Sequence, residues 1–358
     1  MDWKSNNLSL YSGAWLRTLR ERLLSTQSPA SGAKEKIYQK SFSLLPATAR
    51  QFAIMPFMKK LLLIITLLTT YLSANIKTVV SILPQKTFVE AIGGEKVEVA
   101  LMVKPGNSPH TYEPKPSQMK EITKADLYFT IGVEFEQVWM EKFSSLNPKM
   151  RIVDLAEGIE KQPMQAHAHH DAHEEDEHHD EHAEHEERNS HEAHEDHETL
   201  DPHIWTAPEN VLTIANSIYT ALSEQDPENA PYYKKNLEIF TAQVKQTDET
   251  IKKILADTPE HAAFMVFHPA WGYFAKAYGL VQLPVEVEGK APKPQELMQL
   301  IREAREKSVK AIFTQPEFSD ATAKLISAEL GIRVIKVSPL APDWSQNLIN
   351  LANAIAGK

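Results

Sequence analysis

Residues 228–257 read ENAPYYKKNLEIFTAQVKQTDETIKKILAD. Large or apolar side chains recur along this stretch at spacings of three and four residues: Tyr233, Leu237, Phe240, Val244, Thr247, Ile251 and Leu255. Because neither glycine nor proline follows Pro231, the pattern predicts one continuous helix of about seven turns. An ordinary surface helix would also satisfy the pattern. The position of the stretch between two similar halves of the chain favours a rigid spine that limits hinge bending.

Both flanking halves alternate short β-branched stretches with amphipathic stretches. Strands are predicted at Lys77–Leu83, Val97–Val103, Asp126–Gly132, Arg151–Leu155, Ala262–Phe267, Val281–Glu286, Lys310–Thr314 and Arg333–Val337. Helices are predicted at Lys86–Ile92, Ser117–Ala125, Glu134–Phe143, Pro208–Gln225, Trp271–Tyr278, Pro294–Lys307, Ala321–Leu330 and Ser345–Ala356. Strands that alternate with helices form parallel sheets, so we expect an α/β protein with one parallel sheet in each of two lobes.

A targeting segment precedes the first predicted strand. Met58-Lys59-Lys60 is followed by an apolar run over residues 61–68 and by small residues up to Ala74, which is typical of a secretory signal peptide. The run is too short to span a bilayer comfortably. Residues 1–57 lie upstream of this signal, and we interpret them as a non-native or misassigned extension, with the true start at Met58 or Met55.

The composition of the chain limits the cellular compartment and the classes of binding partner that we expect. The chain has no cysteine, which excludes disulfides, thiolate metal sites and a lipid-modified cysteine. An exported protein with neither membrane anchor nor lipid is expected to be free in a periplasm, as a monomer. The chain carries a net charge of −10, so nucleic acid is a poor partner.

An acidic, histidine-rich tract interrupts the first half. Between Asp171 and Glu198, Arg188 is the only base among fourteen Asp and Glu residues. Such a stretch cannot bury enough apolar surface to offset the entropy of ordering, so we expect a mobile, solvated segment. A plain spacer is the alternative, but solubility does not require imidazole, which binds Zn(II), Ni(II) or Cu(II). The accessory low-affinity metal ligands are predicted to be His167, His169, His170, His173, His178, His179, His182, His185, His191, His194 and His197.

Three further histidines stand at predicted strand ends or in loops. His110 lies in a proline-rich loop after a strand, His203 lies just after the tract, and His268 directly follows a strand. Parallel α/β sheets bind their ligands at the carboxyl ends of their strands, so these histidines together predict a metal site. His261 lies in a polar turn and is interpreted as a plain surface residue.

The sequences around these histidines resemble a known family. PHTYEPKP over residues 109–116, DPHIW over residues 201–205 and FHPAWGYF over residues 267–274 are similar to the metal-site segments of the periplasmic zinc-binding proteins called ZnuA, within the cluster A-I solute-binding proteins. The similarity extends from about Lys77 to the C-terminus. It implies two Rossmann-like lobes joined by one long rigid helix, with Zn(II) held in the interlobe cleft by His110, His203 and His268. It also implies high-affinity zinc capture in the periplasm, and delivery to the permease and ATPase of an ABC importer.

The fourth zinc ligand is left open by the sequence. Some zinc-binding relatives have a glutamate directly before the first histidine, where this chain has Pro109. Asp343, water or a tract histidine could complete a tetrahedron, and Glu317 is a weaker candidate. The manganese branch of the family has a carboxylate in place of His268, so three imidazoles favour zinc over manganese or iron. Two other classes remain as alternatives, namely a periplasmic zinc buffer and a zinc hydrolase with an activated water.

The expected organisation has five parts. They are the extension over residues 1–57, the signal peptide over 58–74, an N-terminal lobe over 75–207 that includes the tract loop at 165–200, a helical region over 208–257 with its linking helix at 228–257, and a C-terminal lobe over 258–358.

Overall fold

The structure is a computed structural model that describes residues 75–164, 200–286 and 290–358. The predicted upstream extension, the signal peptide and the eleven tract histidines lie outside the described residues. The described residues belong to one compact unit of the chain. Within them, no helix has both the length and the hydrophobicity needed to cross a membrane.

Two four-stranded parallel sheets form the two lobes, as predicted. The first contains β1 (Ile76–Val80), β2 (Val97–Leu101), β3 (Leu127–Thr130) and β4 (Arg151–Asp154) in the order β2-β1-β3-β4. The second contains β5 (Ala263–Val266), β6 (Val281–Pro284), β7 (Ala311–Thr314) and β8 (Arg333–Lys336) in the order β6-β5-β7-β8. Both lobes therefore have the same strand order, with the first strand of each lobe flanked by its second and third.

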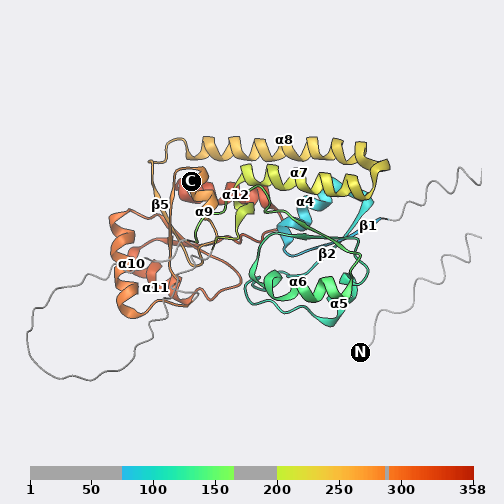
Figure 1. Cartoon of the computed structure of the whole chain (residues 1–358). Helices are drawn as coiled ribbons and strands as arrows, with labels where there is room; N and C mark the ends of the chain where they lie inside the picture. The colour runs from blue at the N-terminus through green and yellow to red at the C-terminus, as the bar shows by residue number, and fades with distance from the viewer. Residues whose placement is uncertain (1–74, 165–199, 287–289) are drawn as a thin grey trace, which may run out of the picture. The chain divides into compact units, whose positions relative to one another are not determined.

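Helices connect these parallel strands (Figure 1). The first lobe has α4 (Leu83–Gly93), α5 (Pro116–Ile122) and α6 (Glu134–Leu146), with a short 3-10 helix at Gly94–Lys96. The second lobe has α9 (Gly272–Ala277), α10 (Pro294–Glu306), α11 (Ala321–Leu330) and α12 (Trp344–Ile355). Along the chain, α7 (Pro208–Gln225) and α8 (Ala230–Leu255) come between the two sheets, with 3-10 turns at Ile204–Thr206 and Pro227–Asn229.

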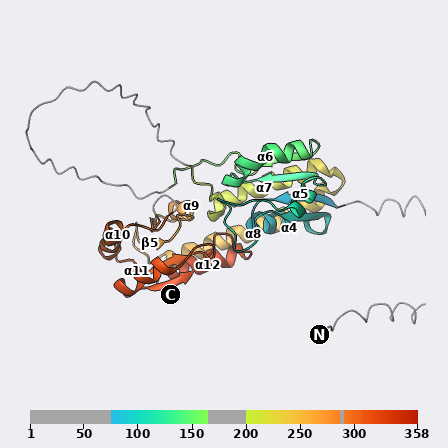
Figure 2. The same ribbon diagram turned by 90° about the horizontal axis from the view of Figure 1, so that it is seen from below.

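The long helix α8 runs beside both lobes (Figure 1, Figure 2). It packs against α7 and α4 and also against α12 from the end of the chain. Its buried residues are the seven that the sequence pattern picked out: Tyr233, Leu237, Phe240, Val244, Thr247, Ile251 and Leu255. Because one apolar stripe contacts helices from both halves, a single continuous core extends across the junction of the lobes.

Some predicted strands are too long at their carboxyl ends. The strand predicted at Lys77–Leu83 ends at Val80, and α4 begins at Leu83 rather than at Lys86. The backbone leaves the sheet because the amides of Ser81 and Ile82 both donate to Oε1 of Gln85, at 2.9 and 3.0 Å. The carbonyls of Val80 and Ser81 still accept from Met102 and Val103 beside them, so the side-chain cap takes up the amides only. Helix α4 then begins directly after the capped amides.

Candidate metal centre

Three imidazoles from separate parts of the chain meet where the lobes join. His110 follows β2, His203 precedes the 3-10 turn at Ile204–Thr206, and His268 follows β5. One ring nitrogen from each lies within 4.8 Å of the others, and Nε2 of His110 is 2.9 Å from Nε2 of His268. No other such group of potential metal ligands occurs among residues 75–164, 200–286 and 290–358. The structure thus brings together the three histidines that the sequence singled out.

The loop that carries His110 is fixed to the first sheet. The hydroxyl of Tyr112 donates to Oε1 of Gln118 at 2.7 Å, and the amide of Gln118 donates to a backbone carbonyl at the end of β2. The ring of Tyr112 packs edge-on against Phe135, with 5.7 Å between centroids. The neighbour of Phe135 is Glu134, whose Oε2 lies 2.8 Å from Nδ1 of His110. Burial raises the pKa of the Glu134 carboxyl, but the hydrogen bond and charge of His110, the backbone of Glu134 and the charge of His203 together lower it below its ordinary value.

His203 is held by the first residue of its own motif, Asp201. Oδ1 of Asp201 accepts hydrogen bonds from Nδ1 of His203 at 2.8 Å and from its backbone amide at 2.9 Å. Both side chains are buried. A β-carbon at Gly272 would come within 2.6 Å of Oδ2 of Asp201, so the third motif leaves room for the carboxylate of the second. Position 272 therefore needs glycine, because any side chain would collide with the carboxylate of Asp201.

Two tryptophans join the His203 segment to the C-terminal part of the chain. Nε1 of Trp205 donates to the carbonyl of Pro339 at 2.8 Å, and Nε1 of Trp344 donates to the carbonyl of Trp205 at 2.7 Å. Both indoles are buried. Because both N–H groups are paired, this contact between distant segments combines hydrophobic burial with satisfied polar groups.

His268 occupies the most enclosed of the three positions. Its Nδ1 lies 2.6 Å from Oε1 of Glu286, which follows β6, and both side chains are almost fully buried. Gln315, which follows β7, donates to the carbonyl of His268 at 3.0 Å. Burial lowers the pKa of His268, although the hydrogen bond to Glu286 opposes that shift. The lowered pKa favours the neutral imidazole, which is the form that binds a metal ion.

Each imidazole thus pairs its Nδ1 with a carboxylate, from Glu134, Asp201 or Glu286. Since a carboxylate accepts, each contact favours a proton on Nδ1, which leaves the lone pair of Nε2 for a metal ion. A tetrahedral zinc ion bonded at 2.0–2.1 Å would hold two nitrogens about 3.3 Å apart. The observed 2.9 Å between two Nε2 atoms needs only a small expansion. These three carboxylates had no predicted role.

A small cavity of about 10 Å³ lies beside the imidazoles. Such a volume is close to the least that holds one water molecule. Glu317 is among the residues that line the cavity, whereas Asp343 is exposed and caps α12 by accepting from the amide of Gln346 at 3.1 Å. Glu317 therefore lies beside the three imidazoles, whereas Asp343 is not among the residues that line this cavity. His261 has a side chain that is 74% exposed, as expected for a surface residue.

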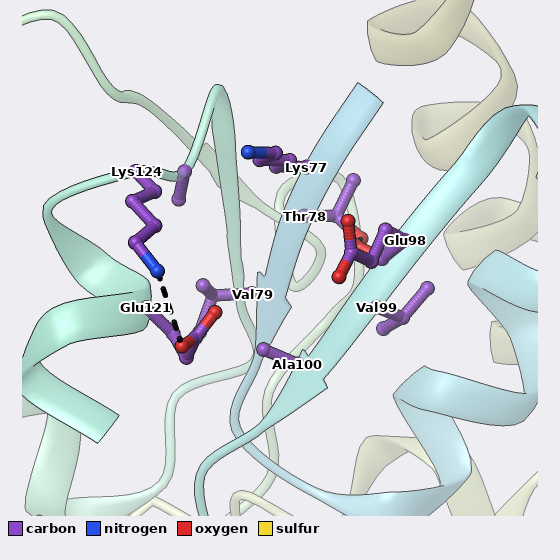
Figure 3. A pocket seen from close by; sticks show the side chains of 9 residues that line it. Lys77, Thr78, Val79, Glu98, Val99, Ala100, Glu121 and Lys124 are labelled. Atoms are coloured by element: carbon purple, nitrogen blue, oxygen red, sulfur yellow. Dashed lines mark hydrogen bonds and ion pairs between the residues drawn. The ribbon is translucent and has the colours of Figure 1, made fainter. Parts of the chain in front are cut away.

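A larger hollow of about 180 Å³ lies elsewhere on the first lobe, beside β1, β2 and α5 (Figure 3). Its charged residues have both signs, and Lys124 pairs with Glu121 at 3.9 Å. Lys77 and Glu98 lie near the amino ends of their strands, the end of the sheet opposite to His110. No imidazole lines this hollow, so it offers none of the donors expected of a zinc site.

Comparison with known proteins agrees with this geometry. Residues 78–357 match the family described as ZnuA, the periplasmic component A of a zinc-uptake complex. The zinc-binding protein AdcA of Streptococcus pyogenes serotype M3 is 26% identical over 296 residues, which cover 79% of this chain and 56% of AdcA. The chain thus spans about half the length of this curated relative.

Solved structures show the same relationship. A crystal structure of ZnuA is 38% identical, with a TM-score of 0.68, and the alignment covers 79% of this chain and 98% of that one. A zinc-bound crystal structure of a ZnuA deletion mutant is also 38% identical, with a TM-score of 0.67 and coverage of 79% and 97%. The family match includes all three histidines and both sheets, and on this basis the chain belongs to the ZnuA family of periplasmic zinc-uptake components.

Proposed function

We propose that this protein captures one Zn(II) ion tightly outside the cytoplasm and delivers it to the permease of an ABC importer. The observation that carries the proposal is the convergence of three imidazoles whose second nitrogens all contact carboxylates. Such carboxylates orient metal-binding imidazoles and raise their basicity. The ion is the cargo of this protein, so the site has to bind it selectively and later release it to the membrane complex.

Zinc is favoured over manganese and iron by the donor set. Neutral imidazole suits zinc, whereas harder cations prefer oxygen ligands. The cluster offers three imidazoles and no carboxylate at the same spacing among the described residues. Zinc is also the metal named for the related AdcA and for the zinc-bound ZnuA structure.

The two alternative classes fare differently. The family consists of components of uptake complexes, which excludes the zinc hydrolase. A zinc buffer would make the histidine tract the main binding segment, and the lobes would be only its carrier. It would not require His110, His203 and His268 to converge from three separate segments. The buffer is therefore the weaker proposal, and a zinc titration separates it from the importer component.

The accessory collector is a second part of the proposal. If the acidic tract is mobile, as its composition predicts, its imidazoles should bind zinc weakly, because each site has to order the chain. The backbone amide of Asp201 donates to the carbonyl of Gln162 at 2.8 Å, so the two ends of the tract are joined next to His203. Zinc held by the tract would therefore be released close to the cleft.

Equilibrium titration with zinc tests both parts. A variant that lacks residues 167–198 should retain one tight site, and His110→Ala in that background should remove it. The matched control is His261→Ala, which changes an exposed imidazole outside the cluster. If the deletion variant holds no tight zinc, or if His110→Ala binds as well as the control, the cleft assignment is wrong. Deletion should also slow zinc loading at scarce zinc, and equal import at every zinc level would contradict the collector.

A further inference from the structure

Three imidazoles leave the fourth position of a tetrahedral zinc ion open. The residues that line the small cavity limit what can fill it. Pro109, Phe318, Pro339 and Leu340 offer no side-chain donor atom. Of the polar side chains apart from the imidazoles, Gln315 is bound to the backbone of His268, and the hydroxyl of Ser108 accepts from the amide of His110. The remaining polar side chain is that of Glu317.

The negative charge of Glu317 is not balanced by a positively charged side chain among the described residues. Glu317 follows β7 and is half-buried. The hydroxyl of Ser338 donates to its Oε1 at 3.3 Å, and the backbone of Glu317 itself also hydrogen-bonds to the carboxylate. No lysine, arginine or histidine pairs with it among the ion pairs of the described residues. Burial raises the pKa of this carboxyl, in keeping with the absence of a neighbouring cation.

Glu317 is next in the chain to a residue that contacts the histidine cluster. Phe318, the next residue, stacks on the imidazole of His268 with 5.1 Å between ring centroids. Glu317 is therefore attached directly to a residue that contacts one of the three histidines. The carboxylate oxygens lie outside the 4.8 Å grouping of the imidazole nitrogens, so ligation requires the side chain to turn away from Ser338. The turn gives up a long hydrogen bond of 3.3 Å, while Ser338 keeps the amide of Leu340 as a partner for its hydroxyl at 3.1 Å.

We propose that Glu317 turns from Ser338 into the cavity and supplies the fourth ligand of the zinc ion. This inference rests on the proposed function, because it requires His110, His203 and His268 to bind the metal. It assigns the fourth position to the residue that follows β7 and not to Asp343 or water. A site with four protein ligands is closed, which suits a protein that holds its cargo and does not activate a water molecule.

Substitution of Glu317 by glutamine removes the charge and keeps the size of the side chain. Asp343→Asn is the matched control, since it changes an exposed carboxylate that caps α12. Two quantities are measured on wild type and both variants: zinc affinity by chelator competition, and the visible ligand-field spectrum of the cobalt-substituted protein. Cobalt reports the number and type of ligands, which a structural effect far from the ion would leave unchanged.

We expect Glu317→Gln to lower zinc affinity by about tenfold or more and to change the cobalt spectrum, while Asp343→Asn matches wild type. An unchanged spectrum in Glu317→Gln would overturn the inference even if the affinity fell. A changed spectrum in Asp343→Asn alone would assign the ligand to that residue and overturn it as well. If the wild-type protein binds neither zinc nor cobalt tightly, the proposed function fails first. The two failures are therefore distinguishable. Thermal unfolding of the metal-free proteins checks that all three remain folded.

Discussion

Removing the negative charge beside His268 should weaken zinc binding more than removing the one beside His110. The change is Glu286→Gln in one variant and Glu134→Gln in the other. Glutamine keeps an oxygen that can accept from Nδ1, so the tautomer and the orientation of the imidazole can persist. What is lost is the charge that makes the imidazole a stronger donor to the metal.

The size of each effect follows from burial. The side chains of His268 and Glu286 are 7% and 6% exposed and lie 2.6 Å apart, so solvent screens their interaction little. The side chains of His110 and Glu134 are 21% and 32% exposed and lie 2.8 Å apart. Loss of such a partner typically costs between tenfold and 100-fold in metal affinity. We assign the upper end, about 2.7 kcal/mol, to Glu286→Gln and the lower end, about 1.4 kcal/mol, to Glu134→Gln.

Zinc affinity by competition with a fluorescent chelator measures both effects. Glu260→Gln is the matched control, because Glu260 lies 3.8 Å from His261 in a pair that is exposed and outside the cluster. The control should bind zinc as wild type does. The reasoning is refuted if Glu286→Gln stays within about twofold of wild type, or if Glu134→Gln is the more damaging change. Unfolding of the metal-free variants separates lost affinity from lost structure.

Three further outcomes follow from the same structure. Gly272→Ala should lower zinc affinity by roughly tenfold, because the added methyl group would displace the carboxylate of Asp201, and chelator competition would detect it. Burial raises the pKa of Glu136 from 4.5 to about 7, so the folded protein binds this proton more tightly than the unfolded chain does, and stability should fall as the pH rises through that window. The difference in unfolding free energy between wild type and Glu136→Gln should change by roughly 3 kcal/mol across it, and a pH-independent difference in denaturant unfolding would speak against this. The lobes should move little on zinc binding, because α8 is continuous and Trp205 is hydrogen-bonded to both Pro339 and Trp344. A clear fall in the radius of gyration on zinc binding, measured by small-angle scattering, would contradict this rigidity.

The elements that could be predicted from sequence are those set by local pattern. The stripe on α8 repeats at helical spacing, so its buried face followed directly. Helix α7 begins at Pro208 and α11 ends at Leu330 before Gly331, and these residue types mark helix ends. Strand ends were less predictable, because β1 ends where the side chain of Gln85, five residues beyond Val80, accepts from the backbone.

The carboxylates of the site could not be predicted, because strand order is a tertiary property. His110 follows β2 and Glu134 follows β3, and they approach each other only because these strands flank β1 on either side. In the second lobe, β6 and β7 flank β5, which brings Glu286 and Gln315 to opposite sides of His268. Asp201 alone is local to its histidine, and the DPH sequence was the one signal that could have indicated it. Knowledge of which strand lies beside which would have indicated the others.

The same strand order in both lobes explains why the proposed site needs both of them. Each sheet presents one imidazole, His110 or His268, with a carboxylate that follows another strand of the same sheet, and the segment that leads into α7 adds His203. One imidazole gives a weak zinc site, so tight binding depends on how accurately the two sheets are held against each other. The core that α8 shares with α4, α7 and α12 supplies that accuracy before the ion arrives. Affinity in this design therefore comes from a preformed junction between the lobes, and weakening the junction should release zinc without any change in the ligands.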